Sequence, residues 1–200
     1  MQVPFANRGR LGRLVLGVWA PMIAIICAYQ LGSHLLTLPV PEVNDPDVQR
    51  ALAQTRHLDE TGEWMLVHVL YTDCNCSVRV ARYLVEEPRP EGLVEKLVLV
   101  GEDPELAAKA QAAGFELYQT DEAGLGTQWH MEAAPVLAVV DPANQVQYLG
   151  GYTDRKQGAA IRDLEILGDL QSTRPVAALP LFGCAVSQTL QRAVDPLGLR

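Results

Sequence analysis

Residues 64–78 read WMLVHVLYTDCNCSV, an apolar run that ends in a short polar turn and two cysteines. A run of this length with few polar residues is typical of a β-strand buried on both faces. Beyond Cys76, apolar residues recur at about helical spacing until Pro88 and Pro90 stop the pattern. The sequence therefore predicts a strand, a turn that carries Cys74-Asn75-Cys76, and a helix.

The place of the two cysteines between a strand and a helix favours a reactive thiolate. The first turn of a helix presents unpaired backbone N–H groups and partial positive charge, and both stabilise a thiolate relative to a thiol. Two sulfurs one residue apart meet only if Cys74 lies in the turn and Cys76 in the first helical turn. We expect Cys74 to be the more exposed thiol and to exchange with a substrate sulfur, and Cys76 to resolve the mixed disulfide.

Strand and helix patterns alternate along the rest of the chain. Strands are predicted at residues 93–100, 115–119, 134–141 and 145–149, and helices at 47–57, 103–114 and 154–170. This order predicts an α/β domain, a mixed sheet with helices on both faces, over residues 59–171. Residues 39–58 are predicted to form a linker and a short helix, and residues 172–200 a C-terminal extension.

The cysteine motif and a distant proline together resemble a known superfamily. Tyr71-x-x-Cys74-x-Cys76 after a strand, with Ala134-Pro135 leading into a later strand and hairpin, resembles the thioredoxin-like superfamily over roughly residues 60–170. The resemblance implies that Pro135 is cis, packs beside the cysteines and, with Ala134, helps to bind substrate backbone. It implies a thiol–disulfide oxidoreductase or isomerase that acts on protein thiols or disulfides and needs no cofactor. The usual motif has two residues between the cysteines, whereas this chain has one.

Cys184 lies in the C-terminal extension, outside the part of the chain that carries this resemblance. Gly183-Cys184 precedes an apolar stretch that predicts a helix through about residue 194. Near a helix N-terminus, Cys184 is a candidate resolving thiol for a mixed disulfide at Cys74 or Cys76. The alternative is a buried small apolar residue.

Two other functions fit the cysteine pair. Closely spaced thiolates suit Cu(I), so Cys74, Cys76 and His130 are candidate ligands in a copper-binding metallochaperone of thioredoxin-like fold. The domain is alternatively a non-catalytic module that binds a partner protein. The formal net charge of −8 argues against nucleic acid as a partner, and four cysteines are too few for a disulfide scaffold.

The N-terminal region has the pattern of a membrane anchor. Residues 1–13 contain three arginines and no acidic residue, and residues 14–38 are uncharged and mostly apolar. A helix needs about 20 apolar residues to cross a bilayer, and basic residues stay on the cytoplasmic side. We expect a single-pass protein of the bacterial inner membrane with its C-terminal domain in the periplasm. A cleaved signal peptide and a buried soluble helix are the alternatives.

Overall fold

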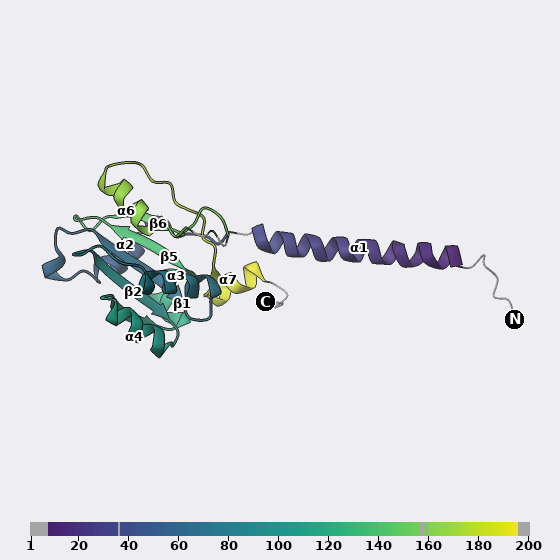
Figure 1. Ribbon diagram of the computed structural model, residues 1–200, viewed down its shortest axis with the longest axis horizontal. Helices are drawn as coiled ribbons and strands as arrows, with labels where there is room; N and C mark the ends of the chain where they lie inside the picture. Colours follow the sequence, from purple (N-terminus) through teal and green to yellow (C-terminus); the bar gives the residue numbers. More distant parts are fainter. Residues whose placement is uncertain (1–7, 36, 157, 159, 196–200) are drawn as a thin grey trace. The chain divides into compact units, whose positions relative to one another are not determined.

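The computed structural model describes residues 8–35, 37–156, 158 and 160–195 (Figure 1). The chain divides into two compact units, Met1–Leu36 and Thr37–Arg200. Helix α1 (Arg8–Leu35) forms the first unit, and all other helices and strands belong to the second. Residues 1–7 of the predicted basic N-terminus lie outside the described residues.

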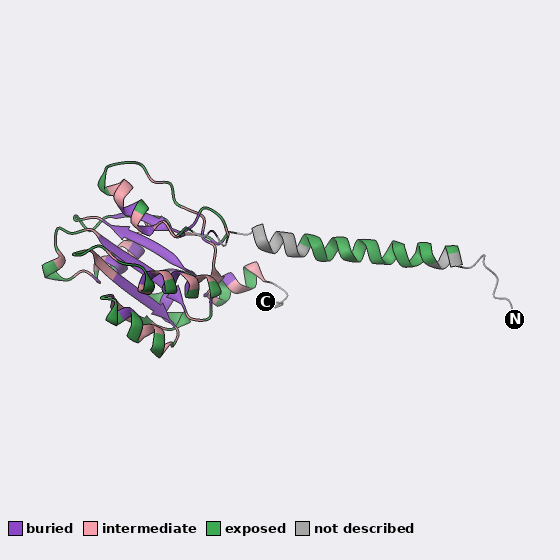
Figure 2. Cartoon of the chain, in the orientation of Figure 1, coloured by how far each residue is buried: buried purple, intermediate pink, exposed green. Residues whose placement is uncertain are grey.

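Helix α1 covers most of the predicted anchor but begins earlier, at Arg8, so that Arg10 and Arg13 fall within the helix rather than before it. Its described apolar side chains, such as Leu14 and Ile25, are exposed (Figure 2). Among the described residues, no helix has the length and apolar character that a membrane crossing needs. The anchor at residues 14–38 is thus not confirmed.

The C-terminal limit predicted for the anchor was wrong. Leu38 belongs to the second unit, where its side chain is buried. Its backbone N–H donates a hydrogen bond to the carbonyl of Leu181, at 2.9 Å. This bridge ties the start of the folded unit to the C-terminal extension.

A five-stranded mixed sheet forms the centre of the second unit, in the order β3-β2-β1-β5-β6. Strands β1, β2 and β3 are parallel, β5 runs antiparallel to β1, and β6 completes a hairpin with β5. The strand bounds are β1 Met65–Tyr71, β2 Val94–Val100, β3 Glu116–Thr120, β5 Val136–Val140 and β6 Val146–Gly150. A separate two-stranded ribbon pairs β4 (Ala133–Ala134) with β7 (Cys184–Ala185).

Apolar side chains on the two faces of the sheet form two cores, because successive residues of a strand point to opposite faces. On one face, Leu66 and Leu70 pack with α3 (Asn75–Glu86), α4 (Pro104–Ala112) and α6 (Asp163–Gln171). On the other face, Met65 and Val67 pack with α2 (Pro46–Ala53), α5 (Glu122–Gln128) and α7 (Gln188–Val194). The predicted mixed α/β sheet flanked by helices is therefore confirmed, and its strands β1 and β5 are buried on both faces (Figure 2).

Two predicted helices begin later in the structure than the sequence pattern indicated. The helix expected at residues 154–170 begins at Asp163, after a loop in which the hydroxyl of Thr153 donates to the carbonyl of Arg155. The helix expected from Gly183 begins at Gln188, because Ser187 caps it and the preceding residues form β7.

A buried polar network holds the middle of β1 to neighbouring elements. His68 bonds to the Tyr152 hydroxyl at 3.0 Å and to Glu95 at 3.1 Å. Arg89 bridges Glu95 and Asp163, with contacts of 3.0 and 2.7 Å. Burial raises the pKa of Glu95, but the hydrogen bonds from His68 and Arg89 outweigh it and leave that pKa below its ordinary value. Both buried carboxylates thus depend on Arg89.

We predict that Arg89→Met lowers the free energy of unfolding by about 3–5 kcal/mol, because it leaves Glu95 and Asp163 buried without their cation. Chemical denaturation measures this loss. Arg50→Met is the matched control: Arg50 pairs with Asp47 on the surface and its removal changes stability by less than about 1 kcal/mol. Equal losses in the two variants would contradict the role assigned to the buried network.

Candidate functional site

The turn between β1 and α3 places Cys74 at the helix N-cap. The amide of Cys74 donates to the carbonyl of Tyr71 at 3.1 Å, and the carbonyl of Cys74 accepts the amide of Val78 at 2.9 Å. Cys74 has an extended backbone, with φ −114° and ψ 113°, and Cys76 lies in the first turn of α3. Both cysteines are therefore close to the unpaired amides of a helix N-terminus.

The exposures of the two cysteines are the reverse of those predicted. Cys74 is fully buried, at 0% exposure, whereas Cys76 is only partly covered. Two segments from elsewhere in the chain lie against the Cys74 sulfur, the residue before Pro135 and the C-terminal extension. The prediction that Cys74 is the more exposed thiol was wrong, because it treated the turn as a free surface.

Ala134 lies beside this sulfur and is followed by Pro135. The peptide bond between them is cis, and both residues are buried. The Cys74 sulfur lies 3.8 Å from the carbonyl oxygen of Ala134, to which the thiol donates a hydrogen bond when it is protonated. The structure thus brings Cys74 together with the alanine–proline pair singled out in the sequence.

The C-terminal extension brings a third cysteine to the same place. Strand β7 runs antiparallel to β4, and Cys184 is the register partner of Ala134. The backbone approach is close: a Cβ on Gly183 would lie 1.9 Å from the Ala134 carbonyl oxygen and 2.6 Å from Cδ of Pro135. Cys184 is partly exposed and lies in a strand, so its predicted place at a helix N-terminus was wrong.

No protein-family model and no curated protein matches the chain. A solved structure of an uncharacterized conserved protein from Geobacillus kaustophilus is 18% identical, with a TM-score of 0.51 over 65% of this chain and 80% of its own. The hypothetical protein SMc02350 from Sinorhizobium meliloti 1021 is 14% identical, with a TM-score of 0.50 over 76% of this chain and 91% of its own. Such identities inform on the fold alone.

The decisive features of the fold are the strand order with its final hairpin, the cysteines at the start of α3 and the cis proline before β5. The fold is thioredoxin-like. A secreted Mycobacterium tuberculosis disulfide oxidoreductase, homologous to E. coli DsbE, is a more distant match. It is 11% identical over 57% of this chain and 84% of its own, with a TM-score of 0.41.

Electrostatics in the thioredoxin-like domain concentrate negative charge on Cys74. Hydrogen bonds from Cys184 and Cys76 lower the pKa of Cys74 well below the ordinary value, and the amide and hydroxyl of Ser77 add to this effect against the cost of burial. Ser77 Oγ is itself buried and has no other hydrogen-bond partner among the described residues. The pKa values of Cys76 and Cys184 are raised, since each donates to the Cys74 thiolate and is partly buried.

Two basic side chains act on the outer thiols of the same cluster. Arg79 and Lys156 both lower the pKa of Cys76, and Lys156 also lowers that of Cys184, against the larger effects of hydrogen bonding and burial. The sequence reasoning missed Ser77, Gly183 and Lys156. Gly183 directly precedes Cys184, which was a weak signal of its role at the site. No local pattern indicated a role for Lys156.

The alternative metal ligands are not assembled around the cysteines. Among the described residues, sets of three potential ligands with atoms within 4.8 Å of one another are His57–Glu60–Glu116 and His68–Glu95–Asp163. Neither set contains a cysteine or His130. His130 is exposed and lines a hollow with residues such as Asp47 and Trp129. The Cys74, Cys76 and His130 set is not among these clusters of the described residues, and the metal site stays a prediction.

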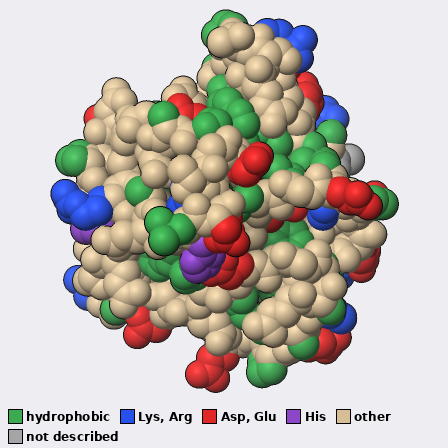
Figure 3. Space-filling view, turned by 90° about the vertical axis from the view of Figure 1, so that its left-hand side faces the viewer, with side chains coloured by type: hydrophobic (Ala, Val, Ile, Leu, Met, Phe, Trp, Pro, Cys, Tyr) green, Lys and Arg blue, Asp and Glu red, His purple; other side chains and the backbone are tan. Residues whose placement is uncertain are grey.

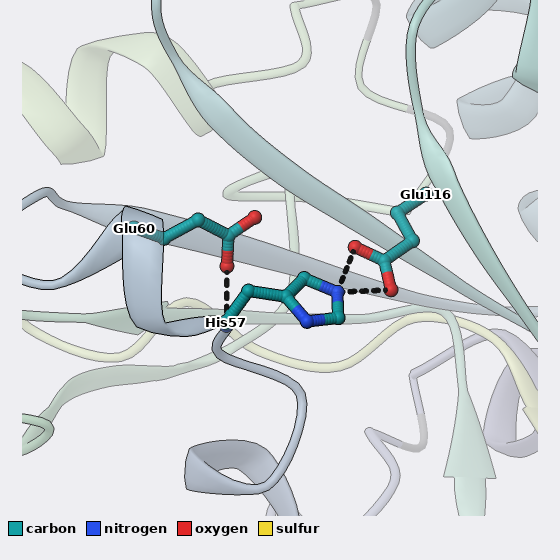
Figure 4. Close-up of side chains that lie close together, drawn as sticks. All are labelled: His57, Glu60 and Glu116. Carbon is teal, nitrogen blue, oxygen red and sulfur yellow. Dashed lines mark hydrogen bonds and ion pairs between the residues drawn. The ribbon is translucent and has the colours of Figure 1, made fainter.

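The His57 cluster is accounted for by protein groups alone. His57 Nε2 lies 2.8 Å from Glu116 Oε1, and Glu60 accepts the backbone amide of His57 at 2.8 Å (Figure 4). The buried ammonium of Lys96 pairs with both Glu60 and Glu116, so a cation already neutralises these carboxylates.

On the face in Figure 3, basic, acidic and apolar side chains are interspersed, and a histidine adjoins acidic groups. The cysteine cluster is the stronger candidate site.

We predict that Cys184→Ala raises the apparent pKa of Cys74 by about one pH unit or more. The variant removes a hydrogen bond to a charged group, which contributes about 1.5–3 kcal/mol. Ultraviolet absorbance of the thiolate in reduced protein, followed against pH, measures the change. Cys184→Ser keeps a donor and is expected to shift the pKa less. A titration of Cys184→Ala identical to that of the unmodified chain would count against this hydrogen bond.

Proposed function

We propose that this chain is a thiol–disulfide oxidoreductase or isomerase that acts on protein thiols or disulfides through Cys74 and Cys76. One observation carries the proposal: the buried Cys74 sulfur lies at a helix N-cap, against Ala134 and next to the cis Pro135. The lowered pKa of Cys74 supports a reactive thiolate at neutral pH.

The proposed exchange transfers two electrons between the cysteine pair and a substrate disulfide. The Cys74 thiolate attacks one substrate sulfur, the substrate S–S bond breaks, and the second substrate sulfur leaves as a thiolate. Cys76 then loses its proton and attacks the Cys74 sulfur. The Cys74–Cys76 disulfide forms, and the remaining substrate sulfur leaves and takes up a proton. The reverse sequence oxidises a substrate dithiol.

Ala134 and Pro135 have a positioning role in this proposal. Ala134 contacts the Cys74 sulfur through its carbonyl, and its backbone pairs with Cys184 of β7. A substrate segment that pairs with Ala134 would take the place of β7. Binding of substrate backbone beside Ala134 and Pro135 is proposed from the resemblance to the thioredoxin-like superfamily.

The proposal includes a location outside the cytoplasm, with the uncharged part of α1, residues 14–35, as the contact with the bacterial inner membrane. It is supported by the basic residues that precede an uncharged apolar stretch. Disulfide exchange also suits an oxidising compartment such as the periplasm.

We predict that protease added to intact spheroplasts digests the thioredoxin-like domain when the full chain is expressed in a bacterium. Immunoblotting against the domain measures the digestion, and a cytoplasmic protein serves as the control that stays intact. Protection of both proteins until the membrane is lysed would mean that the domain faces the cytoplasm.

We predict that Cys74→Ser abolishes insulin reduction and disulfide reshuffling, because the variant has no sulfur to form the mixed disulfide. Turbidity of reduced insulin and recovery of a scrambled disulfide protein measure the two activities. Cys27→Ser is the matched control, since Cys27 lies in α1 outside the site and its loss leaves both activities unchanged. A Cys74→Ser/Cys76→Ser double variant that keeps its cellular phenotype would favour a non-catalytic partner-binding role.

A further inference from the structure

The C-terminal extension pairs with the backbone of Ala134, next to the cis Pro135. Its route is fixed by hydrogen bonds to the domain: the amide of Gly151 donates to Leu179, and the amide of Val186 donates to Glu132, at 3.0 and 2.7 Å. Between these contacts, β7 pairs with β4 and places Cys184 opposite Ala134. The edge proposed for substrate backbone is therefore already occupied by a segment of this chain that carries its own cysteine.

Gly183 makes this close approach possible. Any side chain at position 183 would collide with the Ala134 carbonyl and the Pro135 ring, because even a Cβ would lie within 2.6 Å of both. The neighbouring Leu181 and Val186 are fully buried and hold the extension in place on either side. Buried residues on either side of Cys184 thus fix its position.

Cys74 is the central cysteine of the three, because both of the others act on its sulfur. The outer cysteines, Cys76 and Cys184, each act on the Cys74 sulfur, and β7 places Cys184 opposite Ala134, whose carbonyl oxygen lies 3.8 Å from that sulfur. The shared sulfur, Cys74, is fully buried, and both outer cysteines are partly exposed. A partner protein therefore meets Cys76 or Cys184 before it meets Cys74.

We propose that Cys184 is a third exchanging cysteine, which β7 presents to Cys74, so that Cys74 relays disulfide bonds between two partly exposed thiols. The inference rests on the thiol–disulfide exchange proposed above and deepens it. The domain then has two oxidised forms, Cys74–Cys76 and Cys74–Cys184. Cys74 attacks a substrate disulfide as described above, a partner dithiol attacks the outer sulfur of either oxidised form, and Cys74 connects the two reactions.

The internal step is a balanced exchange with no net oxidation. The Cys184 thiol loses its proton to solvent, and its thiolate attacks the Cys74 sulfur of the Cys74–Cys76 disulfide. The Cys74–Cys184 bond forms, the Cys74–Cys76 bond breaks, and Cys76 leaves as a thiolate that takes up a proton.

A partner protein dithiol then reduces the second oxidised form. Its first thiolate attacks the Cys184 sulfur, and Cys74 leaves as a thiolate. Its second thiolate attacks the partner sulfur of the mixed disulfide and releases Cys184. The partner gains a disulfide, and two electrons enter the domain.

Disulfide mapping of single variants after treatment with oxidised glutathione tests this relay. We expect Cys76→Ser to form a Cys74–Cys184 disulfide, and Cys184→Ser to form a Cys74–Cys76 disulfide. In Cys74→Ser, we expect Cys76 and Cys184 to be recovered as separate glutathione adducts. Mass spectrometry of the full-length chain, with Cys27→Ser in every variant, identifies the bonds. Absence of a Cys74–Cys184 bond in Cys76→Ser, or a Cys76–Cys184 bond in Cys74→Ser, would overturn the relay.

Gly183→Ala tests the role of β7 in the same experiment. In the Cys76→Ser background we expect at least a tenfold lower yield of the Cys74–Cys184 disulfide, because the added methyl group pushes β7 away from Ala134. Gly168→Ala is the matched control, since a Cβ there meets no atom within 4 Å. With Cys76 intact, Gly183→Ala is expected to keep the Cys74–Cys76 disulfide, which shows that the domain has folded. An unchanged yield contradicts the placement of Cys184 by β7.

Measuring dithiol exchange in Cys74→Ser and Cys184→Ser shows whether the relay alone fails or the proposed function fails as well. Loss of dithiol exchange in Cys74→Ser with full exchange in Cys184→Ser would retain the oxidoreductase and overturn the relay. Full exchange in both variants would overturn both proposals. At least a tenfold slower transfer to a protein dithiol in Cys184→Ser, with Cys74→Ser inactive, supports both.

Discussion

The contact of Ala134 with two cysteines is the interaction on which the site depends. The Ala134 carbonyl oxygen lies 3.8 Å from the Cys74 sulfur, and the Ala134 backbone is in register with Cys184. This one residue joins three distant parts of the chain, namely the β1–α3 turn, the residue pair before β5 and the C-terminal extension. Because all three are packed in the core, the sulfurs are placed by tertiary structure. The positions of the three sulfurs thus depend on how the core packs.

The sequence predicts those features of the site that arise from residues close together in the chain. The apolar run of β1 and the helical spacing after Cys76 are local patterns, and they placed the cysteine pair between a strand and a helix. The burial of Cys74 depends on segments far along the chain, so no local pattern predicted it. Strand β7 has two residues, too few for a periodic signature, and the pattern around Cys184 was interpreted as helix.

The opposite face of β1 explains why the turn is held firmly. His68 lies in the middle of that strand and belongs to the network in which Arg89 binds both Glu95 and Asp163. Such a network is stable only when each buried charge has its partner, so it fixes β1 relative to β2 and α6. The strand that delivers Cys74 is therefore held by apolar packing on one face and by apolar packing and paired charges on the other.

The pKa values and the exposures of the three cysteines both favour attack on the outer sulfur of a disulfide that contains Cys74. In thiol–disulfide exchange, the sulfur whose thiol has the lower pKa is the better leaving group. Cys74 has the lowered pKa, and its two neighbours have raised ones. In a disulfide of Cys74 with either neighbour, attack on the outer sulfur expels the stabilised Cys74 thiolate. The outer sulfur is also the one that solvent and a partner reach, because Cys74 is buried. Exchange with partners is therefore favoured at the outer sulfurs, whereas transfer between Cys76 and Cys184 takes place at the buried Cys74 sulfur, inside the cluster.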